Sequence, residues 1–236
     1  MPTHKKQELL YNISGRLKAQ KNDLARLITD ETGKPIKFSM IEVDRAIFTF
    51  RLGAEECSRI YGEVLPLDLL PGSENKTGIV QRFPIGLILG ITPWNFPVNL
   101  AAHKISPALA SGNVIMIKPS SSSMLTAIAL GRIVFDACKE LGITSIPLNI
   151  LPISGSKMDK HISDNRIKLI SFTGSGDVGW GIKKKSDRQK VSLELGGNAG
   201  VIVNYDADID SAVAKITIGG FSQAGQSCIS VQRVYI

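Results

Sequence analysis

The sequence predicts an α/β fold, in which a doubly wound, mostly parallel sheet is flanked by helices and preceded by amino-terminal helices and a protruding hairpin. Three observations support this fold class. Beyond residue 86, short apolar runs alternate with stretches of helical periodicity, which is the element order that a parallel sheet requires. The first 60 residues have helical periodicity. Hydrophobic residues make up 43% of the 236 residues, enough for a substantial core.

The amino-terminal region is expected to form three helices. The pattern indicates a first helix that Thr3 can cap, a short helix over residues 22–32 that Gly33 ends, and a longer helix over residues 36–60. On the long helix, apolar side chains recur at alternating steps of four and three residues, which places Cys57 on the packed face. We therefore expect Cys57 to be a buried small hydrophobe and not a reactive thiol.

Residues 62–82 differ in character from the sequence on either side. Proline, glycine and short alternating stretches in this segment predict a protruding hairpin or connecting strands. Beyond it we expect an amphipathic helix over residues 124–141 and a short helix between the third and fourth strands. The expected strands are residues 86–92, 113–118, 148–152 and 167–173, with further short strands at 191–195 and 201–203.

Residues 174–179 form a literal G-x-G-x-x-G, directly after a predicted strand and at the start of a predicted helix. Glu194 follows Gly174 at about the 20-residue spacing of the ribose-binding acid in the standard dinucleotide fingerprint, so a conventional Rossmann dehydrogenase is one interpretation. Two observations count against it. The fingerprint follows about three earlier strands instead of the first. Glu194 also precedes a Leu-Gly-Gly-Asn turn, which favours pointing its side chain into a cleft.

Composition excludes several other classes. The net charge of +7 is spread along the chain, and its densest cluster, residues 183–185, has no interleaved aromatics, so no nucleic-acid partner is expected. The three cysteines lack metal-ligand or disulfide spacing, so no metal is expected. The chain begins without an apolar signal core, and no stretch reaches roughly 18 consecutive apolar residues. We expect a soluble, cytoplasmic protein without a membrane partner.

Five stretches in one order resemble motifs of the aldehyde dehydrogenase superfamily. Each motif alone is weak, whereas the five together are specific. They extend over essentially the whole chain but over only about half of the family's usual length. The five stretches are Ile91–Pro97 (ITPWNFP), Ile117–Ser120 (IKPS), Ser171–Ser175 (SFTGS), Leu193–Gly197 (LELGG) and Gly225–Cys228 (GQSC).

The resemblance implies NAD(P)-dependent oxidation of a small-molecule aldehyde to a carboxylic acid. Cys228 would be the nucleophile that forms a thiohemiacetal and then a thioester. The side-chain amide of Asn95 and the backbone N–H of Cys228 would donate to the oxyanion. Glu194 would be the general base for the water that hydrolyses the thioester.

The resemblance also implies the cofactor contacts. Lys118 matches a residue that binds the adenosine ribose, and Ser175 matches one that contacts the pyrophosphate at a helix N-terminus. Ser121 stands where many members carry a Glu that repels a 2′-phosphate, so NAD or NADP is expected, with a slight preference for NADP or dual use. The full expected set is Ile91, Thr92, Pro93, Trp94, Lys118, Ser120, Ser121, Gly155, Gly174, Ser175, Gly179 and Leu195.

By the same resemblance, residues 1–225 are expected to form the NAD(P)-binding domain, with an oligomerisation hairpin near residues 62–82. Residues 226–236 would begin a truncated catalytic domain whose final strand lacks its neighbours, so the chain itself would be weakly active or inactive. The intact protein is expected to be a homodimer or homotetramer. Two other functions stay open: a catalytically inactive dinucleotide-binding fragment or pseudoenzyme, and a CoA-acylating semialdehyde dehydrogenase.

Overall fold

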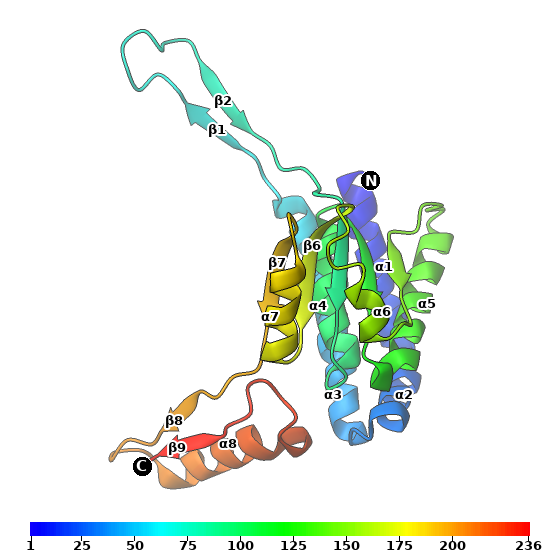
Figure 1. Ribbon diagram of the computed structural model, residues 1–236, viewed down its shortest axis with the longest axis vertical. Helices are drawn as coiled ribbons and strands as arrows, with labels where there is room; N and C mark the ends of the chain where they lie inside the picture. Colours follow the sequence, from blue (N-terminus) through cyan, green and yellow to red (C-terminus); the bar gives the residue numbers. More distant parts are fainter.

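A five-stranded parallel sheet lies at the centre of the computed structural model, which describes residues 1–236 (Figure 1). The strand order is β5-β4-β3-β6-β7, and each neighbouring pair is parallel. The chain winds outward from β3 in one direction, returns to the centre and winds outward in the other, which confirms the predicted doubly wound fold. The strands are β3 (Leu87–Ile91), β4 (Val114–Lys118), β5 (Leu148–Ile150), β6 (Ile167–Thr173) and β7 (Lys190–Glu194).

Helices cover both faces of this sheet (Figure 1). Strand side chains alternate between the faces, so Ile88 packs in one hydrophobic core and Leu89 in the other. Because these strands are buried on both faces, they appear in the sequence as continuous apolar runs. One face carries α1 (Thr3–Ala19), α2 (Lys21–Thr32), α3 (Ile36–Glu56), α4 (Pro97–Ala110) and α5 (Met124–Glu140), and the other carries α6 (Gly155–Asp159) and α7 (Gly176–Lys185).

The amino-terminal helices match the predicted ranges with two corrections. Thr3 is the first residue of α1 and not its cap, and no side chain caps this helix. The helix α3 ends at Glu56 and is followed by a single 3₁₀ turn, Cys57–Arg59, so Ile60 lies beyond the helix and is exposed. Cys57 is buried, as predicted, and burial raises the pKa of its thiol.

Two helices have no counterpart in the sequence prediction, for opposite reasons. Most residues of α4 are buried, so it lacks a polar stripe, and Pro107 lies inside it. The helix α8 (Ile209–Phe221) has no buried residue in this structure, so it lacks a packed stripe. Amphipathic periodicity identifies helices that are half buried, and neither helix meets that condition.

The helix α5 and the turn before it, residues 121–140, are long and apolar enough to cross a membrane by length and composition. The helix itself was predicted over residues 124–141, but its apolar length was not. Such a signal is also given by the core helix of a soluble protein, and 44% of the segment is buried. Leu130 and Val134 on α5 belong to the large hydrophobic core, together with Leu148 of β5.

Strands β1 (Glu63–Pro66) and β2 (Thr77–Val80) form an antiparallel hairpin that projects from the body of the molecule (Figure 1). Its apolar side chains are exposed: the opposed residues Val64 and Ile79 are 73% and 70% exposed. The predicted hairpin is confirmed, and its role in oligomerisation stays a prediction.

A small unit lies at the opposite end of the molecule from the hairpin (Figure 1). Here β8 (Gly200–Ile202) pairs in parallel with β9 (Arg233–Tyr235), and α8 lies between them in sequence. The last strand therefore has a neighbour, contrary to expectation. A 3₁₀ turn over Ser222–Gly225 connects α8 to the segment that carries Cys228.

Candidate functional site

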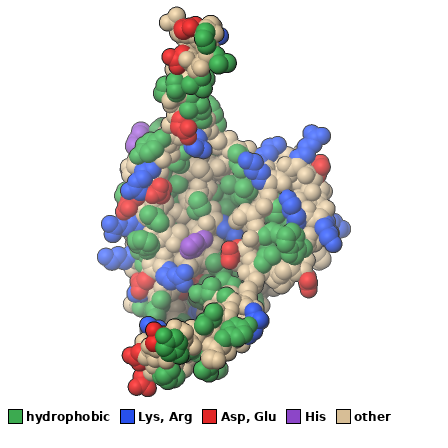
Figure 2. Space-filling view, turned by 90° about the vertical axis from the view of Figure 1, so that its left-hand side faces the viewer, with side chains coloured by type: hydrophobic (Ala, Val, Ile, Leu, Met, Phe, Trp, Pro, Cys, Tyr) green, Lys and Arg blue, Asp and Glu red, His purple; other side chains and the backbone are tan.

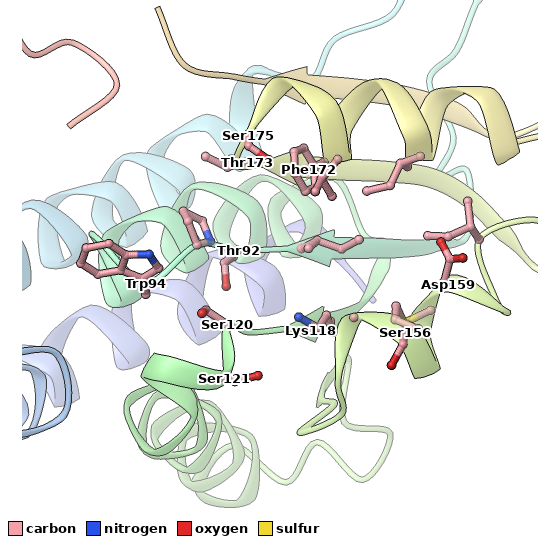
Figure 3. Close-up of a pocket in the computed structure, with 18 residues that line it drawn as sticks. Thr92, Trp94, Lys118, Ser120, Ser121, Ser156, Asp159, Phe172, Thr173 and Ser175 are labelled. Carbon is pink, nitrogen blue, oxygen red and sulfur yellow. The ribbon is translucent and has the colours of Figure 1, made fainter. Parts of the chain in front are cut away.

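A cleft of about 650 Å³ lies at the carboxyl ends of the central strands (Figure 3). The order of the strands reverses between β3 and β6, and ligands of open α/β sheets bind at such a switch point. The strand β3 contributes Ile91 to the wall, β4 contributes Lys118, and β6 contributes Phe172. In Figure 3, residues of β6 and α7 lie on one side, and residues at the end of β4 lie on the other.

Most of the predicted cofactor-binding residues line this cleft: Ile91, Thr92, Pro93, Trp94, Lys118, Ser120, Ser121, Gly155, Gly174 and Ser175. Gly179 and Leu195 do not. A Cβ at Gly179 would lie 2.6 Å from a methyl carbon of Leu195, so this glycine lets α7 approach its neighbours. A Cβ at Gly174 would lie 2.6 Å from the ring of Phe172. Both glycines therefore make room for protein side chains. The binding roles of all these residues stay predictions.

The remaining wall of the cleft was not predicted from the sequence. It consists largely of side chains on α6 and α7 and of Phe172, which lies inside the quoted SFTGS motif. The acid among them, Asp159, is paired with Lys185 at 2.5 Å. Phe172 and Thr173 lie in the SFTGS motif and Val178 lies in the glycine-rich stretch of residues 174–179, but only the fold shows that their side chains shape the wall. The unpredicted residues are Ser156, Met158, Asp159, Ile162, Phe172, Thr173, Val178 and Ile182.

Two features of the cleft suit an anionic ligand. Ser175 occupies the cap position of α7 without a side-chain capping bond, so the N–H groups of the first turn remain open at the cleft. Lys118 is only 9% exposed, and burial lowers the pKa of its ammonium group. No nearby carboxylate raises this pKa again, so the ammonium group has no protein counter-charge. A dinucleotide, which carries phosphates and ribose hydroxyls, fits this combination.

A second cavity of about 530 Å³ adjoins the cleft and is lined by Asn95, Glu194 and Cys228. Asn95 follows β3, Glu194 ends β7, and Cys228 follows the 3₁₀ turn after α8. The structure therefore brings the three predicted catalytic residues to one cavity, although their roles stay predictions. Both the thiol of Cys228 and the carboxylate of Glu194 are exposed. The two cavities share Pro93, Trp94, Thr173, Gly174 and Ser175.

Two hydrogen bonds tie the segment before Cys228 to Asn95. The side-chain amide of Gln223 donates to the backbone carbonyl of Asn95 at 2.6 Å, and the side-chain amide of Asn95 donates to the carbonyl of Gln226 at 3.0 Å. Gln223 and Ala224 have left-handed φ values of 50° and 56°, a conformation that costs non-glycine residues of the order of 1–3 kcal/mol. Sequence reasoning missed Gln223, because its partner is distant in the chain.

N–H groups remain available in the second cavity. An amide nitrogen carries two hydrogens, and one of those on Asn95 is used by the Gln226 carbonyl. The Asn95 side-chain oxygen accepts from the backbone N–H of Phe96 at 3.0 Å, which fixes the orientation of the amide. The backbone N–H of Cys228 donates to no protein group. These two donors are the ones that an oxyanion beside Cys228 would require.

Lys104 on α4 is a buried cation that sequence reasoning did not single out. Its ammonium group donates to the hydroxyls of Ser171 at 3.0 Å and Thr173 at 2.8 Å. Burial lowers the pKa of Lys104 to about 8, and the charge of Glu194 acts in the opposite direction. Lys104 is thus electrostatically coupled to Glu194.

The doubly wound sheet with a cleft at its switch point is the arrangement of dinucleotide-binding α/β proteins, and a cavity that contains a cysteine adjoins this cleft. The chain belongs to the aldehyde dehydrogenase family: the model of that family matches residues 1–236. This agrees with the resemblance that the five motifs predict.

Individual relatives agree with this assignment. The 3-sulfolactaldehyde dehydrogenase of Priestia aryabhattai is 38% identical over 99% of the chain, and the lactaldehyde dehydrogenase of Methanococcus aeolicus is 43% identical over 97%. Among solved structures, the glyceraldehyde-3-phosphate dehydrogenase GapN of Methanocaldococcus jannaschii, complexed with NADP, matches 99% of the chain with 39% identity and a TM-score of 0.93. The chain spans 48%, 48% and 50% of these three proteins, about half of each.

Proposed function

We propose that the protein carries out NAD(P)-dependent oxidation of an aldehyde to a carboxylic acid. The observation that supports this most strongly is that Asn95, Glu194 and Cys228 line one cavity, which shares the walls at residues 93–94 and 173–175 with the cleft at the switch point. A thiol, a carboxylate and an amide are the groups that a covalent aldehyde oxidation needs. The relatives' names, which are those of aldehyde dehydrogenases, point the same way.

The first step is addition to the aldehyde. The Cys228 thiolate forms a C–S bond to the carbonyl carbon, and the carbonyl π electrons move to oxygen. The free hydrogen of the Asn95 amide and the backbone N–H of Cys228 donate to this oxyanion. The carbon becomes tetrahedral, which makes it a hydride donor.

Oxidation and hydrolysis follow. Hydride leaves the carbon as the C=O bond re-forms, and the aldehyde carbon becomes a thioester on Cys228. Bound NAD or NADP supplies the hydride acceptor for this step. Glu194 then removes a proton from water, whose oxygen attacks the thioester and releases the carboxylic acid and the Cys228 thiolate. Two electrons leave as hydride, and the water oxygen is retained in the acid.

We further propose that the cleft accepts both dinucleotides, with a slight preference for NADP or dual use. Lys118 lies at the end of β4 without an opposing carboxylate, and the hydroxyl of Ser121 lies close by on the wall of the cleft. A 2′-phosphate therefore meets a cation and hydroxyl donors instead of an acid. The NADP complex of GapN supports this choice.

The second cavity also suggests the class of aldehyde. Arg45 lines it, with its guanidinium 6.0 Å from the centroid of the Phe96 ring, and takes part in no ion pair. The named substrates of the three relatives are all small 2-hydroxyaldehydes, and two of them carry a sulfonate or phosphate. We therefore propose a small 2-hydroxyaldehyde with an anionic group that Arg45 binds.

A substitution of Arg45 tests this substrate class. Arg45→Met should lower kcat/KM for glyceraldehyde 3-phosphate about 10- to 100-fold, the range for a hydrogen bond to a charged group, and leave lactaldehyde nearly unchanged. Arg45→Lys should retain part of the preference for glyceraldehyde 3-phosphate over lactaldehyde. It keeps the positive charge but loses the planar guanidinium that binds an anion with two hydrogen bonds. An equal loss with both aldehydes would contradict an anion-binding role.

Reduced-cofactor formation tests the function itself. Aldehyde and NADP should give at least weak absorbance of NADPH with the wild-type protein and none with Cys228→Ser, while both bind NADP equally in calorimetry. Binding without reduction in the wild type would favour a non-catalytic dinucleotide-binding protein. Acyl-CoA as the product when CoA is supplied, in place of the free acid, would favour the CoA-acylating reaction.

A further inference from the structure

The helices α4 and α5 start immediately after the two loops that carry the site. The loop before α4 contains Trp94 and Asn95, and the segment before α5 contains Ser120 and Ser121, the latter at the start of the 3₁₀ turn Ser121–Ser123. The first backbone N–H groups of a helix have no partner within the helix. Neither helix has a side-chain cap from its own preceding residue. The N–H groups at both helix starts must therefore find acceptors elsewhere.

A buried carboxylate on α3 provides the acceptor for α4. One oxygen of Glu42 accepts the backbone N–H groups of Val98 at 2.8 Å and Asn99 at 3.1 Å. The other oxygen forms an ion pair with Lys34, and both side chains are almost completely buried. The Lys34 ammonium lies 4.0 Å from the centroid of the Phe96 ring, the residue that follows Asn95. The pair thus holds the end of the Asn95 loop at two points.

A carboxylate on α2 does the same for α5. One oxygen of Glu31 accepts the backbone N–H of Leu125 at 2.6 Å. The other accepts the backbone N–H of Thr126 at 2.8 Å and its hydroxyl at 2.7 Å. Glu31 is more than 90 residues away from both partners in the sequence.

We propose that Glu42, together with Lys34, and Glu31 are positioning residues that set the Asn95 loop and the Ser120–Ser121 loop, respectively. The amino-terminal helices thereby position the two loops. They contribute none of the residues at 93–94 and 173–175 that line both cavities. The loop anchoring is independent of the proposed function, while its consequence for catalysis rests on that function.

The Glu42–Lys34 pair is better explained by positioning than by stability. Removing two charges from water is costly, and replacing a buried ion pair by apolar residues of similar volume is often neutral or stabilising. The two orphan N–H groups at the start of α4, in contrast, require an acceptor at that place. The acceptor and the charge can therefore be separated by mutation.

Two matched double variants make this separation. Lys34→Met with Glu42→Gln removes both charges and keeps an acceptor oxygen, whereas Lys34→Met with Glu42→Leu removes the acceptor too. In a Trp180→Phe background, Trp94 is the only tryptophan and reports on the Asn95 loop. We expect the Leu variant to increase acrylamide quenching of Trp94 by about twofold, within the limit set by a side chain that is already 37% exposed, and the Gln variant to stay near wild type.

Glu31 is tested by cofactor affinity. Glu31→Ala should weaken NADP binding about fivefold in calorimetry, with Glu31→Gln closer to wild type and Trp94 quenching unchanged in both. The Glu42→Leu variant should also weaken NADP binding, because the Asn95 loop carries Pro93 and Trp94 of the cleft, whereas the Glu42→Gln variant should leave NADP affinity nearly unchanged. Asp44→Asn serves as the control: this acid lies on α3 and pairs with Lys21 at 2.6 Å but caps no helix, so neither readout should move.

The contrast between the matched variants is the decisive result. Equal quenching of Trp94 in the Gln and Leu variants would overturn the role of Glu42, and unchanged NADP affinity in Glu31→Ala would overturn the role of Glu31. Changes in both readouts that simply follow the melting temperature would indicate general destabilisation and also overturn the proposal. Trp94 quenching is measured without cofactor or aldehyde, so it remains informative if the proposed oxidation fails.

Discussion

The ammonium group of Lys104 is buried against two hydroxyls, and its titration affects stability. The pKa of Lys104 is lowered to about 8 in the folded chain from an ordinary value of 10.5, so the unfolded chain binds more protons between these pH values. Stability should therefore rise as pH increases from 8 to 10.5, by an amount of the order of 2–3 kcal/mol.

Lys104→Met tests this pH dependence, because it removes the titrating group. In urea unfolding, the free energy of unfolding of the wild type should be higher at pH 10 than at pH 8. In Lys104→Met this difference should be much smaller. The matched control is Lys183→Met, at an exposed position in the last turn of α7. A rise of equal size in Lys104→Met would show that other groups cause the pH dependence.

At the same scale, the sequence was informative about residues that carry motifs. Asn95, Glu194 and Cys228 could be selected because each lies in a local pattern that the family shares. Gln223 and Lys104 lie outside these patterns. Gln223 bonds to Asn95, 128 residues away, and Lys104 bonds to Thr173, 69 residues away. Local spacing carries no information on contacts of that range, so only the fold could identify them.

At the scale of elements, prediction succeeded where burial gives a distinctive pattern. The strands β3 and β6 are buried on both faces and read as apolar runs, and α5 is amphipathic. The helices α4 and α8 lack such a pattern, since one is mostly buried and the other mostly exposed. The pairing of β9 with β8 was also missed, because strands of three residues do not specify a partner.

The close packing of α7 gives a prediction for two glycines of one helix. A Cβ at Gly179 would lie 2.6 Å from a Leu195 carbon and 3.2 Å from the Phe172 ring, whereas a Cβ at Gly181 would meet nothing within 4 Å. Gly179→Ala should lower the free energy of unfolding by about 1–3 kcal/mol through overpacking. It should also weaken NADP binding, because α7 forms one wall of the cleft.

Gly181→Ala is the matched control. It should raise the free energy of unfolding by about 0.5–1 kcal/mol, since alanine is the better helix former and has room here. Thermal denaturation and NADP titration of both variants provide the measurement. Similar effects of the two substitutions would contradict the packing of α7 against Phe172 and Leu195.

At the scale of the whole molecule, apolar surface is concentrated at the two ends. Figure 2 shows hydrophobic side chains along the projecting hairpin and over the unit formed by β8, α8 and β9. On the hairpin, Val64 and Ile79 are exposed, and on α8, Ile218 and Phe221 are 69% and 77% exposed. Exposed apolar surface of this kind marks contact sites. The central sheet with its two cores separates these ends.

The hairpin gives a prediction on assembly. If it joins copies of the protein, Val64→Lys together with Ile79→Lys should shift the sedimentation coefficient from that of a dimer or tetramer towards that of a monomer. The expected cause is the cost of burying two charges in an apolar contact. Leu70→Lys near the hairpin tip, at another exposed apolar position, is the control for added surface charge. An unchanged oligomer in the double variant would contradict this role.

The proposed oxidation depends on covalent chemistry at Cys228. The measurement that tests it most directly is the peptide mass of Glu194→Gln after incubation with lactaldehyde and NADP, because loss of the general base should make the thioester accumulate. We predict a lactoyl adduct on the peptide that contains Cys228, one NADPH for each adduct, and no adduct in Cys228→Ser. NADPH formed without an adduct, or an adduct on another residue, would contradict the assignment of Cys228 as the nucleophile.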